Sequence, residues 1–230
     1  MKTSNIIIIG FAIFIISGLL FLFIDAKKHK KEVEKNIAYK EFKLPQFKVV
    51  VGEKGSNFQI DKSDSMLIKI EYSKNTTLPK KLYEVINDTL HIYSKLWITV
   101  KCKEIRSIIG NKPLWIGINN FVPDSLMIKM IGGKLHYNAT YSNENKEFNQ
   151  KIFNLAIIAS DSAQIKINKA KLNNLSLKSD NAMIINNCYV KSVNAILSNK
   201  SEFLSLDSIS NLVIEKDSTC QVRISNHNAY

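Results

Sequence analysis

Arginine is almost absent from this lysine-rich chain, and cysteine, proline and glycine are scarce. Of its 230 residues, 32 are lysine or arginine and 20 are aspartate or glutamate, which leaves a formal net charge of +12. Arg106 and Arg223 are the only arginines. Nucleic-acid recognition relies on arginine forks and on stacked aromatic side chains. Neither is concentrated here, so we expect no nucleic-acid partner and a solvated, lysine-rich surface.

The three cysteines, Cys102, Cys188 and Cys220, are far apart in the sequence and belong to no CxxC or Cys/His cluster. Cys188 and Cys220 have apolar neighbours, which is typical of small core residues. The four histidines lack the spacing of metal ligands, and the sequence contains no glycine-rich phosphate loop and no G-x-S-x-G motif. We therefore predict no catalytic residues, no metal and no cofactor.

Acidic residues are sparse in the second half of the chain, where a polysaccharide lyase would need clustered carboxylates and a basic proton acceptor. Asp161, Asp180 and Asp217 recur at nearly the same turn, and Asn199 replaces the acid in one copy. A stacked acidic ladder there could hold a cation. A solvated row of turn residues is the favoured interpretation, because each acid has lysines nearby.

The aromatic residues form no clear carbohydrate platform in the sequence. Trp115 stands in an apolar run, Trp-Ile-Gly-Ile, and is interpreted as a core residue. Tyr137 and Tyr141 are assigned to a polar loop. Because residues 139–150 lack apolar periodicity, we predict an exposed interaction loop there.

Charged residues are missing between positions 6 and 24, which form an uncharged run of 19 residues. As a helix this run is about 28 Å long, the thickness of a bilayer core. Because no small-residue cleavage site follows, we predict an uncleaved transmembrane anchor over residues 1–25, with a cleaved signal peptide as the alternative. Residues 26–42 alternate lysine and glutamate and are interpreted as a basic, helical juxtamembrane stalk.

From residue 43 onward, short β-rich runs replace the helical pattern. Apolar and polar residues alternate over positions 66–72, as in a half-buried strand. Two such runs flank Asn87-Asp88, which predicts a hairpin over residues 83–93. The second half repeats a strand-turn-strand unit, with Ser160, Ser179, Ser198 and Lys216 at matched positions.

The repeat interval of about 19 residues predicts an all-β fold in which parallel strands stack and bury one apolar column. We assign a parallel β-helix (a β-solenoid) to residues 43–224, with N-terminal strands or a cap at 43–120, repeats at 121–224 and a tail at 225–230. A leucine-rich repeat is disfavoured because its L-x-x-L-x-L frame is missing. Two packed antiparallel sheets remain the structural alternative.

The order of an apolar N-terminal helix, a Phe47-Lys-Val-Val-Val strand, Asn87-Asp-Thr-Leu-His-Ile and serial Asn-Leu-x-Ile units resembles the bacterial head GIN domain proteins, described as auto-transporter adhesins. The resemblance covers about residues 43 to 224. It implies a right-handed parallel β-helix and a location in the cell envelope. It supplies no catalytic residues.

Six of the aspartates begin Asp-(Ser/Thr) triplets, mostly followed by an apolar residue. These triplets resemble the O-glycosylation acceptor of one group of Gram-negative envelope bacteria, and an attached glycan would face the surface. Asp-Ser is also ordinary turn chemistry before a strand, so both interpretations stay open. The acceptor positions would be Ser65, Thr89, Ser125, Ser162, Ser208 and Ser218.

Two functions fit these observations. The first is a non-catalytic, membrane-anchored envelope protein that displays a β-helix for adhesion or interaction with a protein or glycan partner. The second is a cytoplasmic, membrane-tethered scaffold that polymerises in the manner of bactofilin-like filaments, with a homo-oligomer as its expected state. Lys27, Lys28, Lys30 and Lys31 follow the apolar run and favour a cytoplasmic domain by the positive-inside rule. The resemblance and the triplets favour an extracytoplasmic domain, and we adopt that orientation.

Overall fold

The computed structural model describes residues 2–139 and 153–225. Two compact units divide the chain. Met1–Tyr39 and Tyr72–Thr77 form the first unit, and Lys40–Glu71 and Leu78–Tyr230 form the second.

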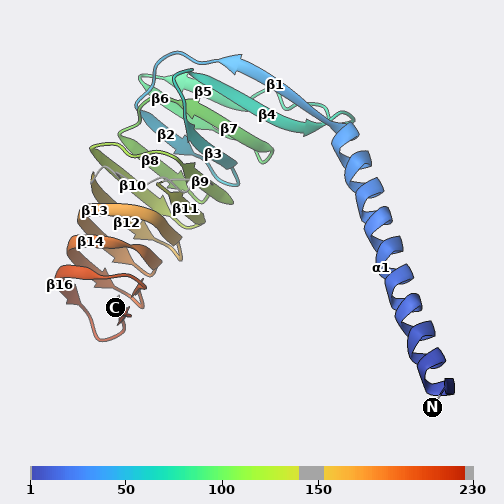
Figure 1. The fold of residues 1–230 in the computed structure, drawn as a ribbon. Coiled ribbons are helices and arrows are strands. Elements are labelled where there is room, and N and C mark those ends of the chain that lie inside the picture. Colours follow the sequence, from blue (N-terminus) through green and yellow to red (C-terminus); the bar gives the residue numbers. More distant parts are fainter. Residues whose placement is uncertain (1, 140–152, 226–230) are drawn as a thin grey trace. The chain divides into compact units, whose positions relative to one another are not determined.

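The first unit contains the helix α1 (Lys2–Asn36), followed by the first residues of strand β1 (Ile37–Lys43) (Figure 1). The backbone N–H of Lys74 donates to the carbonyl oxygen of Asn36 at 2.8 Å, at the point where the helix ends. The predicted helical stalk therefore stops at Asn36, because the next residues pair as a strand with β4. No helix in residues 2–139 or 153–225 is both long and apolar enough to count as a candidate membrane span.

Strands are the only regular secondary structure among the described residues of the second unit, so the predicted all-β class is confirmed. After β1, the strands in the described residues are β2 (Val49–Gly52), β3 (Asn57–Lys62), β4 (Leu67–Ser73), β5 (Tyr83–Ile86), β6 (Thr89–Ile92), β7 (Trp97–Cys102), β8 (Ser107–Asn111), β9 (Trp115–Asn119), β10 (Ser125–Ile131), β11 (Lys134–Asn138), β12 (Phe153–Ser160), β13 (Gln164–Asp180), β14 (Met183–Ser198), β15 (Glu202–Ser205), β16 (Ile209–Lys216) and β17 (Gln221–Ile224).

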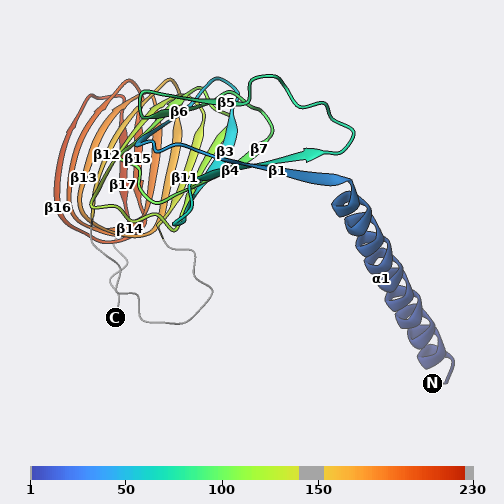
Figure 2. The ribbon, with the colours of Figure 1, turned by 90° about the horizontal axis from the view of Figure 1, so that it is seen from above.

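Strands of successive repeats stack in parallel, so that β8 pairs with β10 and β9 with β11. Figures 1 and 2 show this stacking from β8 to β17. Gln164 pairs with Met183, Met183 with Glu202, and Glu202 with Gln221, so this column advances by 19 residues at each step. Parallel pairing at this interval agrees with the repeat seen in the sequence. It buries alternate side chains along the strands from β10 to β15.

The repeat alignment was wrong by one residue in its second and fourth copies, since Lys216 pairs with Leu197 and not with Ser198. Ser160 pairs with Asp180, not with Ser179, because the register between β12 and β13 shifts after Phe153. In a strand, a slip of one residue moves a side chain to the opposite face. Ser179 is therefore buried, and its hydroxyl donates to the hydroxyl of Ser201 at 3.0 Å.

The strands before residue 121 interleave with one another. β2 lies between β6 and β8, and β3 lies between β7 and β9, all in parallel. β4 and β5 are antiparallel to β7 and β6. The predicted hairpin is thus confirmed in β5 and β6. Its turn residues Asn87 and Asp88 have φ of 45° and 61°, as a two-residue hairpin turn requires.

Inward-facing side chains form the core. Ile128, Ile157, Leu177 and Ala195 lie in one such column, each at most 2% exposed. All three cysteines are free and buried, as expected for Cys188 and Cys220. Tyr137 was wrongly assigned to a loop. It is a fully buried residue of β11, and its hydroxyl donates to the carbonyl oxygen of Phe121.

A row of stacked asparagine side chains runs across the strands at one edge of the core. The amide of Asn138 donates to Asn119 at 3.2 Å, that of Asn168 to Asn138 at 3.0 Å, and that of Asn187 to Asn168 at 2.8 Å. Asn119 in turn donates to Asp61 at 3.2 Å. We call these four asparagines the asparagine ladder. In each step of the ladder, the amide N–H of one asparagine donates to the part-buried side-chain oxygen of the asparagine on the adjacent strand.

Candidate functional site

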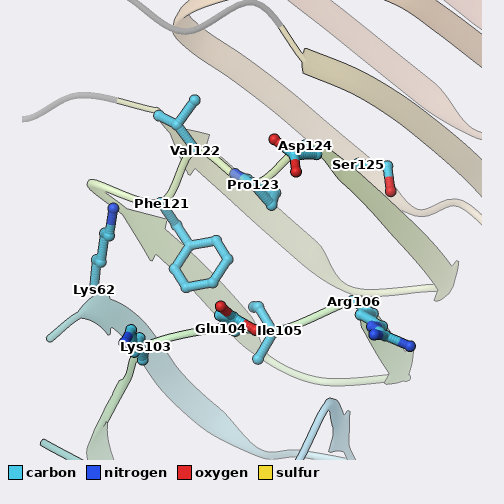
Figure 3. A pocket seen from close by; sticks show the side chains of 10 residues that line it. All are labelled: Lys62, Lys103, Glu104, Ile105, Arg106, Phe121, Val122, Pro123, Asp124 and Ser125. Atoms are coloured by element: carbon cyan, nitrogen blue, oxygen red, sulfur yellow. The ribbon is translucent and has the colours of Figure 1, made fainter. Parts of the chain in front are cut away.

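A pocket of about 390 Å³ opens where three segments near the ends of β3, β7 and β9 meet (Figure 3). Lys62 ends β3, residues 103–106 connect β7 to β8, residues 121–124 lie in the connection from β9 to β10, and Ser125 begins β10. In Figure 3, Lys62 and the 103–106 connection lie on one side of the pocket, and residues 121–125 lie on the other.

The interleaved position of β3 explains why these segments meet. β3 lies between β7 and β9, but the chain leaves it at Lys62 toward β4 instead of turning into the next coil. The 103–106 connection therefore passes the end of β3 on its way to β8. The backbone N–H of Arg106 donates to the carbonyl oxygen of Lys48 at 2.8 Å, and the carbonyl oxygen of Arg106 accepts from Met127 at 3.0 Å.

The pocket combines an apolar base with a charged rim. Ile105 and Phe121 are each 2% exposed. The rim carries three cationic side chains, Lys62, Lys103 and Arg106, and two acidic ones, Glu104 and Asp124. Its ten lining residues include neither histidine nor cysteine. The arrangement suits binding of a small group by charge-assisted hydrogen bonds.

Asp161, Asp180 and Asn199 of the predicted turn row border a second hollow of about 460 Å³, together with Thr219. The side-chain amide of Asn199 donates to Asp180 at 2.6 Å, and its backbone N–H donates to Asp217 at 2.8 Å. A hydrogen bond from the Thr219 hydroxyl, and then backbone N–H donors, hold the pKa of Asp217 well below its usual range. These carboxylates are thus engaged by protein donors, which favours a row of turn residues.

No group of three or more His, Cys, Asp or Glu side chains in residues 2–139 and 153–225 could hold a metal ion. Asp161 itself pairs with the ammonium group of Lys112 at 3.6 Å. The ladder of carboxylates considered as a cation site is therefore not assembled among these residues.

The six predicted acceptor residues lie apart from one another, each in a turn or at the first residue of a strand. Four side chains are exposed and two, Thr89 and Ser208, are half-buried. The Asp217 carboxylate accepts from the backbone N–H of Thr219, two residues further on, at 2.8 Å, which is typical of a turn. Only one acceptor lines the pocket described above. The exposed acceptors are Ser65, Ser125, Ser162 and Ser218.

The interpretation of Trp115 as a core residue was wrong. Ile116 and Ile118 are the buried residues of β9, so strand alternation turns Trp115 outward, where it is half-buried. There its ring stacks on that of Trp97, with centroids 5.0 Å apart and planes inclined by 23°. The ring of His136 approaches edge-on, with its centroid 6.0 Å from that of Trp115. The alternation within Trp-Ile-Gly-Ile was the signal in the sequence that could have revealed this.

The predicted interaction loop cannot be compared in the same way, because residues 140–150, including Tyr141, lie outside the described residues. The same holds for residues 226–230 of the predicted tail.

Three solved structures resemble the fold of this chain, each described as a "putative adhesin". One from Parabacteroides distasonis shares 11% identity and a TM-score of 0.57, covering 82% of this chain and 97% of that chain. One from Bacteroides fragilis shares 12% identity and a TM-score of 0.52, with 83% and 98% covered. One from Parabacteroides merdae shares 10% identity and a TM-score of 0.50, with 83% and 97% covered.

No protein-family model matches the chain, and no curated protein matches its sequence. At these identities the similarity is one of fold. The assignment to the head GIN domain family therefore stays a prediction.

Proposed function

We propose that this protein is a non-catalytic, membrane-anchored protein of the cell envelope that displays the outer surface of a right-handed parallel β-helix for adhesion. The fold carries this proposal. Its stacked parallel strands match 97% of the solved structure from P. distasonis that is described as a "putative adhesin", with a TM-score of 0.57. Such a stack offers a long outer surface whose side chains can vary without disturbing the buried column.

The anchor in this proposal is the uncharged run of residues 6–24, which lies within the helix α1. The sequence alone supports this anchor, because an uncharged run of 19 residues has the length that a bilayer core requires. The four lysines that follow it favour retention on the cytoplasmic side, but long domains are exported largely regardless of such charges. We place the β domain outside the cytoplasm, where an adhesive surface can meet its partner.

A second candidate is the cytoplasmic scaffold that polymerises end to end. The last coil favours it, because Leu212 of β16 is 40% exposed although it continues a buried column. The first coils oppose it, because antiparallel β4 and β5 pair with the outer edges of β7 and β6. End-to-end growth requires open strands at both ends. The occupied edge at the first coils therefore favours the displayed surface over the filament.

Cysteine labelling in cells tests the orientation. The three native thiols are buried, so the unmodified chain should react little with a membrane-impermeant maleimide. Ser162 is exposed in a turn, and Ser162→Cys adds one accessible thiol. We expect this thiol to be labelled in intact spheroplasts. Labelling that appears only after lysis would place the domain in the cytoplasm and make the scaffold the leading candidate.

The Asp-Ser triplets provide a separate test in the native host. If the domain is exported and the triplets are acceptors, the intact mass of the purified protein should exceed the sequence mass by whole glycan units. The exposed hydroxyls of Ser65, Ser125, Ser162 and Ser218 are the expected sites. A mass equal to that of the sequence would leave turn formation as the role of the triplets.

A further inference from the structure

The only two tryptophans of the chain lie together on the outer face of the sheet. Trp97 begins β7 and Trp115 begins β9, and both pair with Asn57 of β3, from opposite sides. The strands β7 and β9 are not direct neighbours, so the two indoles meet across β3. Interleaving of β3 thus creates a contact between two outward-facing aromatic side chains.

Gly117 provides the room for this arrangement. A Cβ atom at this position would overlap the ring of Trp115, two residues earlier on the same strand. Glycine therefore lets the indole lie against its own strand. The ring of His136, on the neighbouring strand β11, extends the contact. We call Trp97, Trp115 and His136 the aromatic row.

Lysines surround one end of the aromatic row. Lys166 of β13 pairs in register with His136, and Lys134 precedes His136 by two residues on the same strand. Lys134 is exposed and Lys166 is half-buried. Burial, followed by the charges of these two lysines, lowers the pKa of His136. The two ammonium groups therefore lie close enough to the His136 ring to interact with it electrostatically.

The acidic side chains near the row are few. Asp61 accepts hydrogen bonds from Gln59 at 3.0 Å and from Asn119 at 3.2 Å. Glu71 pairs in register with Trp97 at the opposite end of the row from the lysines. The surface around Trp115 and His136 therefore combines aromatic rings with positive charge.

We propose that the aromatic row, together with Lys134 and Lys166, binds an anionic polysaccharide. Sugar rings would lie against the aromatic side chains, and carboxylate groups would pair with the two lysines. Aromatic side chains that are half-buried and wet at one edge suit such contacts. A polyuronate, a polysaccharide whose sugars carry carboxylates, would also be attracted electrostatically to Lys134 and Lys166. This inference rests on the proposed adhesive function and names the class of its partner.

A single-stranded nucleic acid is the competing polyanion. Such ligands stack successive bases on separate aromatic platforms, usually with arginine nearby. Here the two indoles stack on each other, so they form one joint platform and not separate platforms for successive bases. The neighbouring charges are lysines, which act as point charges and not as planar forks. These features favour the polysaccharide.

The intrinsic fluorescence of the full-length protein in detergent micelles tests the proposal. Because Trp97 and Trp115 are the only tryptophans, the emission reports on this surface alone. We expect an oligogalacturonate to change the emission with saturation and a neutral cello-oligosaccharide of equal length to bind at least about 10-fold more weakly. Absence of a saturable change with oligogalacturonate overturns the proposal.

Matched charge variants locate the binding. The double variant Lys134→Gln/Lys166→Gln should raise the Kd for oligogalacturonate about 10-fold. Lys129→Gln/Lys178→Gln removes the same charge from exposed positions of β10 and β13 on the other face, and should leave the Kd within about twofold. An equal loss in both variants would show general attraction to the net charge and would overturn the site.

Two further comparisons complete the test. Gly117→Ala displaces the Trp115 ring and keeps every lysine, so it should also weaken binding while the circular dichroism stays unchanged. An unaltered Kd would remove the aromatic row from the site. A thymidine oligonucleotide that binds as tightly as oligogalacturonate would assign the surface to nucleic acid. A domain labelled from outside the cell that fails to bind oligogalacturonate would overturn this inference and leave the proposed function standing.

Discussion

Replacing Asn168 by alanine should destabilise the protein through the asparagine ladder. Asn168 is the rung between Asn138 and Asn187, donating to the first at 3.0 Å and accepting from the second at 2.8 Å. All three side chains are half-buried. The variant therefore removes two hydrogen bonds and leaves one acceptor and one donor without their ladder partners.

The magnitude follows from these contacts. Each lost hydrogen bond reduces the free energy of unfolding by about 1 kcal/mol, and each stranded polar group adds a similar cost because water reaches it only in part. Asn168→Ala should therefore lower the free energy of unfolding by about 2–4 kcal/mol. Asn174→Ala is the matched control. It removes an equivalent amide bond to Asn154, at 3.0 Å, from an exposed position, and should cost about 0.5 kcal/mol or less.

Urea denaturation of the full-length protein in detergent micelles, followed by tryptophan emission, measures both variants. The midpoint should fall strongly for Asn168→Ala and hardly for Asn174→Ala, with the same dependence on urea concentration for both. Equal shifts in the two variants would refute the reasoning. They would show that half-burial of the ladder does not increase the contribution of its hydrogen bonds to the free energy of unfolding.

Three other predictions follow from single side chains. Gly133→Ala should cost at least about 2 kcal/mol in urea denaturation, because Gly133 has φ of 76° and its new Cβ would overlap a carbonyl oxygen of the β8–β9 connection. Gly55→Ala, with φ of 78° but only a lysine side chain nearby, should cost less, and the reverse order would contradict this account. The pKa of Asp217 is lowered in the folded protein, so its stabilising effect is present above its ordinary 3.8 and is lost as the pH falls below that value. Asp217→Asn should therefore flatten the acid limb of a plot of stability against pH, and an unchanged limb would exclude this contribution. Burial raises the pKa of Cys102 and of Cys188 to about 12, so a thiol reagent should modify them only in urea, and rapid reaction in buffer would contradict their burial.

The candidate site was predicted only in part, and two errors show why. Ser179 was aligned with Ser160 because both follow a similar apolar run, but a register shift after Phe153 moves it into the core. Trp115 was assigned to the core because its neighbours are apolar, although alternation in β9 turns it outward. Composition identifies a strand, whereas the face of each residue depends on the register with its neighbours.

The pocket could not be read from the sequence at all. Its lining comes from the end of β3 and from two connections that lie more than 40 and more than 55 residues further along the chain. No local pattern indicates that β3 interleaves with β7 and β9. The turn chemistry, in contrast, was readable. Asn87-Asp88 adopts the positive φ values expected of a turn at this pair.

The sequence by itself determined the strands, the 19-residue interval and the tight turns, because alternation and turn preference are properties of neighbouring residues. Only the tertiary structure decided which strands lie next to each other. Pairing of β3 with both β7 and β9 brings Trp97 to Trp115, leaves the pocket beside Lys62 and starts the asparagine ladder at Asp61. Such contacts join segments distant in sequence, and their formation depends on burying a shared column, which no single segment can do alone.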